Sequence, residues 1–177
     1  MLNITHDFVN HWAGEYDKQY ADGPDAREER AIRGWLANHC DPKFLNKDCF
    51  IRIGLWKTKR QTSAYKSNES TLIEEATRLA CEATNERLKL HILMVLRGVS
   101  VAVASTILHY LYPDTFPIFD FRVRASLKKA GLWSRDVGNS SADAWEEYVK
   151  ILRDLSTRLG VSLRDLDKAL WAYDKLS

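Results

Sequence analysis

The sequence has few of the residues from which metal and cofactor sites are commonly built. Its three cysteines, Cys40, Cys49 and Cys81, are too few for the four-thiolate ligation of an iron–sulfur cluster or a closed zinc site. Their odd number also argues against a framework of disulfides. No pair of histidines stands at metal-ligand spacing, and no glycine-rich phosphate loop occurs. We therefore expect buried or free thiols and no organic cofactor.

Long apolar segments are also lacking. No apolar run approaches the roughly 20 residues that a membrane-spanning helix needs. The first residues, MLNITHDFVNHW, have neither the basic start nor the apolar stretch of a signal peptide. By contrast, 45% of the 177 residues are hydrophobic and six are tryptophan, a composition typical of a folded core. We expect an intracellular, cytoplasmic protein associated with the nucleoid and not with a membrane.

The net charge of +2 decides little, but the charges are unevenly distributed along the chain. The first thirty residues are acidic on balance. The stretch GLWKTKRQTSAYKSN, residues 54–68, contains cations and no acid, and a second basic group lies between residues 122 and 135. The cations of the two groups are Lys57, Lys59, Arg60 and Lys66, then Arg122, Arg124, Lys128, Lys129 and Arg135. Together they could form a phosphate-binding face, and separately each could be a solvated surface.

Apolar residues recur at helical spacing along most of the chain, and no segment shows convincing strand alternation. The pattern predicts helices over about 4–20, 25–39, 70–83, 86–96, 101–111 and 120–130, a further segment near 42–53, and two C-terminal helices. Gly160 is expected to end the first C-terminal helix, and Ser162 to cap the second. The basic stretch 54–68 is expected to be a loop. The prediction is one all-α domain over residues 1–177; if it divides, the lobes are 1–68 and 69–177.

The most informative segment runs from Leu96 to Leu127, LRGVSVAVASTILHYLYPDTFPIFDFRVRASL. Its first part predicts a hairpin of two helices joined by a short turn that contains Gly98. Small residues such as Ala102 and Ala104 allow the helices to approach closely. Backbone N–H groups at the start of the second helix suit a phosphate oxygen. A glycine turn between two helices is common, however, and by itself does not indicate DNA binding.

The segment downstream of the turn makes the pattern more specific. Leu96, Gly98 and Val99 are followed by an alanine-containing helix and by the loop FPIFD, which ends at Asp120, 24 residues after Leu96. Over about residues 85–130 the chain resembles the helix-hairpin-helix DNA glycosylases of the endonuclease-III, oxoguanine and alkyladenine branches. The resemblance implies that family's helical fold, with Asp120 as the general base that also stabilises positive charge on the deoxyribose.

The same resemblance implies how the protein meets double-stranded DNA that carries a damaged or modified base. The backbone of the hairpin, with or without a monovalent cation, would hold a phosphate, and nearby cations would hold others. By residue chemistry alone, and not by the resemblance, an aromatic or long side chain of the basic stretch is a candidate for the base pocket or for filling the gap left by the flipped base. The implied hairpin residues are Leu96, Gly98, Val99, Ser100 and Ala102; the cations are Lys57, Lys59, Arg60, Arg122 and Arg124; the gap-filling candidates are Trp56, Gln61 and Tyr65.

The sequence departs from the family pattern at two hairpin positions. Ser100 stands where the second glycine of the turn is usual, and Ala102 stands where bifunctional members carry a lysine nucleophile. Because a Schiff base needs an amine, the alanine predicts a monofunctional enzyme that hydrolyses the bond and leaves an abasic site. Asp120 also has a purely structural interpretation, as the N-cap of the helix that follows it.

Two other functions remain open from the sequence: a helix-hairpin-helix module that binds DNA without catalysis, and a helical protein-interaction domain. The sequence does not identify the excised base. Uracil, an alkylpurine, an oxidised purine and a phage-modified cytosine are all compatible with it, as are roles in repair and in phage defence. It indicates no obligate protein partner.

Overall fold

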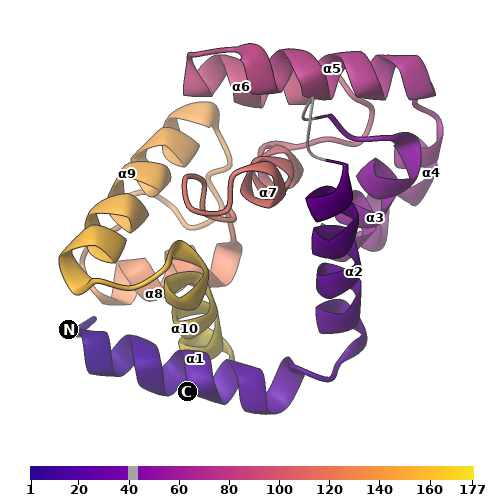
Figure 1. Ribbon diagram of the computed structural model, residues 1–177. Helices are drawn as coiled ribbons and strands as arrows, with labels where there is room; N and C mark the ends of the chain where they lie inside the picture. Colours follow the sequence, from indigo (N-terminus) through magenta and orange to yellow (C-terminus); the bar gives the residue numbers. More distant parts are fainter. Residues whose placement is uncertain (40–43) are drawn as a thin grey trace. The chain divides into compact units, whose positions relative to one another are not determined.

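The computed structural model describes residues 1–39 and 44–177 (Figure 1). These residues form helices and loops without any strand, which confirms the predicted all-α class. The helix expected near 42–53 begins at Lys47, and its first expected residues lie outside the described part, as does Cys40.

Cys49 is buried and Cys81 half-buried, both as reduced thiols. No helix within the described ranges is long and apolar enough to cross a membrane.

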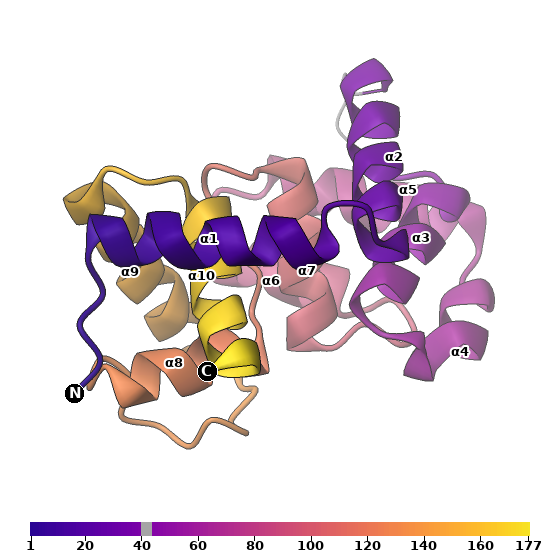
Figure 2. The same cartoon turned by 90° about the horizontal axis from the view of Figure 1, so that it is seen from below.

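The described residues fall into two compact units, and unit 1 comprises residues 1–23 and 112–177. Its core is the C-terminal helix, which packs against the three other helices of the unit. Figure 2 shows the first helix lying across the last one. The helices of unit 1 are α1 (His6–Tyr20), α8 (Phe121–Lys129), α9 (Ala142–Leu159) and α10 (Leu163–Leu176).

Local signals define the ends of the unit 1 helices. Gly160 follows α9 in the left-handed conformation, with φ of 64°, so a residue without a Cβ ends that helix at low cost. The Ser162 hydroxyl accepts a hydrogen bond of 3.0 Å from the N–H of Asp165 and caps α10. Both expectations for this region are confirmed.

Unit 2 comprises residues 24–111. Its most buried helix is the last one, α7, in which Ala102 alone is half-exposed and all other residues are buried. A helix that is apolar on all sides belongs in a core. The helices of unit 2 are α2 (Pro24–Asn38), α3 (Lys47–Lys57), the 3-10 helix η1 (Lys59–Gln61), α4 (Thr62–Lys66), α5 (Ser70–Glu82), α6 (Glu86–Leu93) and α7 (Val101–Leu111).

The basic stretch 54–68 is mostly helical, and the prediction of a loop was wrong. It contains the last turn of α3, then η1 and α4. Gly54, the first residue of the expected loop, lies inside α3, where a Cβ would stand 2.9 Å from Cε2 of Tyr65. The glycine therefore serves close packing between α3 and α4 rather than chain flexibility.

The bounds of the two units differ from the lobes expected at 1–68 and 69–177. The N-terminal helix α1 joins the C-terminal helices because its aromatic side chains pack on α10. The Tyr173 ring lies 5.4 Å from the rings of both Phe8 and Trp12, and Trp171 lies 5.5 Å from Tyr16. Such a contact between the ends of the chain leaves no local signal in the sequence.

Candidate functional site

The helical hairpin predicted from the sequence is formed by α6, a turn over residues 94–100, and α7. Gly98 has φ of +85°, and a Cβ there would lie 3.0 Å from Cβ of Ala64. Glycine is thus required both by the backbone conformation and by the close approach of α4. Ser100 stands where the family pattern has a second glycine, and its φ is not positive. The turn therefore needs the left-handed conformation at Gly98 but not at Ser100.

Asn68, which the sequence analysis did not single out, holds the hairpin turn in place. Its side chain is 2% exposed. The amide oxygen accepts a 2.8 Å hydrogen bond from the N–H of Arg97, and the amide nitrogen donates a 3.0 Å bond to the carbonyl of Arg97. The two bonded residues are 29 positions apart, and no local pattern marks the pair. Asn68 therefore fixes the hairpin turn to the end of α4.

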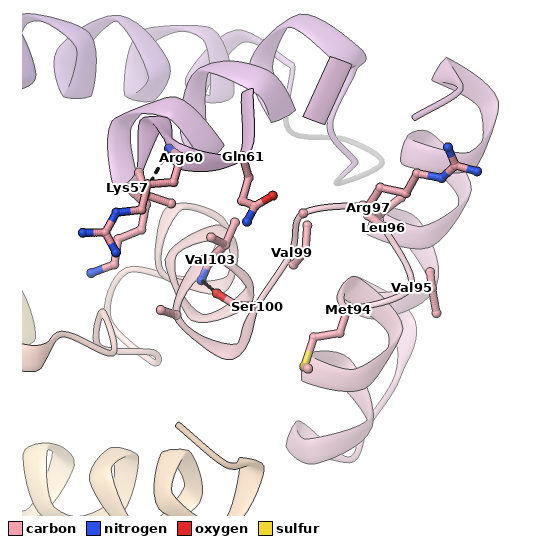
Figure 3. Close-up of a pocket in the computed structure, with 13 residues that line it drawn as sticks. Lys57, Arg60, Gln61, Met94, Val95, Leu96, Arg97, Val99, Ser100 and Val103 are labelled. Carbon is pink, nitrogen blue, oxygen red and sulfur yellow. Dashed lines mark hydrogen bonds between the residues drawn. The ribbon is translucent and has the colours of Figure 1, made fainter. Parts of the chain in front are cut away.

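A groove of about 680 Å³ lies along the hairpin within unit 2 (Figure 3). One wall is the end of α3 with η1, and the other is the hairpin turn with the start of α7. The buried apolar side chains of Leu96, Val99 and Val103 contribute to its lining. The remaining lining residues are Lys57, Thr58, Arg60, Gln61, Met94, Val95, Arg97, Gly98, Ser100 and Ala102.

The charge of this groove is of one sign. Three cations line it, Lys57, Arg60 and Arg97, and no acid of the described residues does. In Figure 3 the side chains of Lys57 and Arg60 extend from the same wall, whereas that of Arg97 extends away from the turn. Lys59 is exposed beside them on η1 but does not line the groove. The structure thus brings part of the basic stretch together with the hairpin.

The three residues proposed to fill a gap in DNA have different environments. Gln61 is exposed, and Figure 3 shows its amide extending toward the hairpin turn. Trp56 is half-buried: its indole N–H donates a 3.0 Å hydrogen bond to the carbonyl of Asp25, and its ring meets the edge of Tyr110. Of the two residues, Gln61 is thus the one that lines the groove.

Tyr65, the third candidate, is fully buried, so the prediction that it enters DNA was wrong. Its ring occupies the space that Gly54 and Gly98 leave open. Its hydroxyl has no hydrogen-bond partner among the described residues. Burial raises the pKa of this hydroxyl. The aromatic ring is a packing element that joins α3, α4 and the hairpin.

The second basic group lies in unit 1. Arg124 is 4% exposed; its Nε donates a 3.2 Å bond to the carbonyl of Asp120, and its guanidinium stacks 4.0 Å from the centre of the Phe119 ring. Burial lowers the pKa of Arg124. The prediction that Arg124 contacts phosphate was therefore wrong, because the side chain is enclosed. Arg122 is half-exposed and pairs with Asp174 at 3.1 Å.

Asp120 ends the loop PDTFPIFD of unit 1 and begins α8. Its Oδ1 accepts a 2.9 Å hydrogen bond from the N–H of Arg122, so the interpretation as an N-cap is confirmed. The residue is half-exposed, whereas Phe116, Ile118 and Phe119 before it are buried. The Phe116 ring stacks on Trp145 of α9 at 5.9 Å. A packed apolar loop thus presents a carboxylate at the surface of the unit.

Comparison with known proteins adds no relative: no family model, no curated protein and no solved structure matches this chain.

Proposed function

We propose that the protein is a monofunctional DNA glycosylase, which binds duplex DNA through the groove of unit 2 and hydrolyses the N-glycosidic bond of a damaged or modified base. The proposal is supported chiefly by one groove, which Lys57, Arg60 and the hairpin line together. No acid of the described residues lines this groove. Two cations beside the N-terminus of α7 form an arrangement suited to the phosphates of a nucleic-acid backbone.

The hairpin contributes its backbone to this binding. The first N–H groups of α7 have no partner within the helix, and the helix dipole places partial positive charge at the same end. The exposed Ser100 and the half-exposed Ala102 leave this end accessible. Hairpin carbonyls could also hold a monovalent cation between the turn and a phosphate, an addition on which the proposal does not depend.

Asp120 supplies the chemistry in this proposal. As the bond between C1′ and the base nitrogen breaks, the base leaves with the electron pair, and positive charge builds on the sugar. The carboxylate stabilises that charge and takes a proton from the water whose oxygen bonds to C1′. Ala102 offers no amine at the position of the lysine nucleophile, so the expected product is an abasic site.

A DNA-binding module without catalysis is the second candidate. The cap that Asp120 provides for α8 favours it, because that hydrogen bond alone gives the carboxylate a structural role. This candidate uses the same groove and predicts the same contacts with phosphate.

The test is incubation of the protein with duplexes that carry uracil, an alkylpurine, an oxidised purine or a modified cytosine, followed by alkaline cleavage of abasic sites. Strand cleavage that depends on one modified base supports the glycosylase. Borohydride added during turnover should trap no covalent adduct, since the chemistry is hydrolytic. Salt-dependent binding of every duplex without base release would instead support the DNA-binding module, and no binding would remove both.

A further inference from the structure

The backbone of Asp120 is held by two side chains from different helices. Tyr148 of α9 is fully buried, and its hydroxyl donates a 2.7 Å hydrogen bond to the carbonyl of Ile118. The N–H of Asp120 in turn donates to the same hydroxyl. Nε of Arg124, on α8, donates to the carbonyl of Asp120. The N–H and the carbonyl of this residue thus each have a buried side-chain partner.

We infer that Tyr148 and Arg124, here named the Asp120 clamp, are positioning residues that fix the carboxylate of Asp120 for glycosidic hydrolysis. The inference rests on the proposed function. Neither clamp residue needs to touch DNA, because each acts on the main chain from which the carboxylate projects.

The arrangement explains why these polar groups are buried beside an otherwise apolar loop. The Phe119 ring lies between the clamp residues, with its centre 5.1 Å from that of the Tyr148 ring and 4.0 Å from the Arg124 guanidinium. Arg124 also donates to the carbonyl of Asn139, which anchors its far end. Both side chains are therefore immobilised, and rotation of the Asp120 backbone would break its hydrogen bonds with both of them. A misplacement of about 1 Å in a catalytic group can cost on the order of 10²-fold in rate.

The test compares single-turnover base release and DNA affinity for Tyr148→Phe and Arg124→Lys with those of the wild type. Ser126→Ala is the control for the tyrosine, since it removes a buried 2.7 Å hydrogen bond, to the carbonyl of Leu170, in the same unit. Arg135→Lys is the control for the arginine, because Arg135 pairs with Glu147. All assays run far below the melting temperature of each variant, with circular dichroism confirming the fold.

We expect both clamp variants to lose about tenfold or more in the single-turnover rate while the Kd for DNA stays within about twofold, and both controls to keep the wild-type rate. A folded clamp variant with the wild-type rate overturns the inference and leaves the glycosylase intact. Equal rate losses in the controls also overturn it, since any lost contact would then have the same effect. If Tyr148→Phe does not fold, Arg124→Lys decides alone. Absence of base release by the wild type overturns the proposed function together with the inference.

Discussion

Two buried tyrosines differ in what their hydroxyl groups do. The hydroxyl of Tyr148 donates a hydrogen bond to the carbonyl of Ile118, whereas the hydroxyl of Tyr65 has no hydrogen-bond partner among the described residues. A buried polar group without a partner carries a desolvation cost that its removal abolishes, and a bonded group leaves its partner unsatisfied when it is removed. The same substitution therefore has opposite consequences at the two positions.

We expect Tyr148→Phe to lower the free energy of unfolding by about 1–3 kcal/mol, because it strands buried backbone groups. Tyr65→Phe should leave the free energy of unfolding unchanged or raise it. Urea denaturation of the two variants and the wild type measures both effects. A loss at Tyr65 as large as that at Tyr148 would show that its hydroxyl has a partner.

The tyrosine in the clamp also makes stability depend on alkaline pH. Burial raises the pKa of Tyr148 well above its usual value, and the carboxylates of Asp167 and Asp120 add to this effect. In the unfolded chain a tyrosine ionises near pH 10. Because the folded state holds the proton more tightly, its stabilisation is complete below about pH 10 and is lost as the pH rises beyond that. The fall in unfolding free energy above about pH 10 should be shallower in Tyr148→Phe than in wild type; equal slopes would contradict the assigned cause.

At the scale of secondary-structure elements, most helices could be predicted from their own sequence. The helices against which each one packs could not. Periodicity and caps predicted the hairpin helices, the end of α9 at Gly160 and the cap at Ser162. They did not predict the helices of the stretch 54–68, whose first residue, Gly54, lies inside α3 against the ring of Tyr65. Tyr65 and Arg124 were assigned to DNA by residue type, but burial is set by tertiary contacts that residue type does not reveal.

The hairpin turn depends on Gly98, and Gly98→Ala tests this. The substitution forces a residue with a Cβ to a φ of +85° and places that Cβ 3.0 Å from Ala64. We expect a loss of at least about 1 kcal/mol in the free energy of unfolding, together with weaker binding to all duplexes. Gly34→Ala is the matched control, because nothing lies within 4 Å of its added Cβ on α2, and it should stabilise by about 0.5–1 kcal/mol. Equal unfolding free energies for the two variants would show that the turn tolerates a side chain.

At the scale of the whole molecule, the two basic groups of the sequence belong to different units. In unit 2, Lys57 and Arg60 of the first group line the groove with the hairpin, whereas Arg122 and Lys129 in unit 1 both pair with Asp174. Composition could predict that cations gather, but which of them meet acids depends on the fold. We therefore expect phosphate binding at Lys57 and Arg60.

The double variant Lys57→Ala with Arg60→Ala should bind every duplex more weakly, whatever its sequence, because phosphate contacts do not distinguish bases. The slope of log affinity against log salt should fall by about two, one for each lost cation. Lys66→Ala removes an exposed cation of the same stretch that does not line the groove, and it should keep the wild-type slope. A loss confined to one base sequence would show that these side chains read bases instead.

The catalytic role proposed for Asp120 is tested by single-turnover base release by Asp120→Asn on the duplex that the wild type processes, with DNA affinity measured in parallel. Asparagine keeps the size and much of the capping ability of aspartate, so the protein should fold with a loss of at most about 1 kcal/mol. We expect a rate at least about 10²-fold lower, which corresponds to a barrier higher by about 2.7 kcal/mol, with DNA affinity equal or greater. Wild-type base release by a folded Asp120→Asn protein would contradict this role.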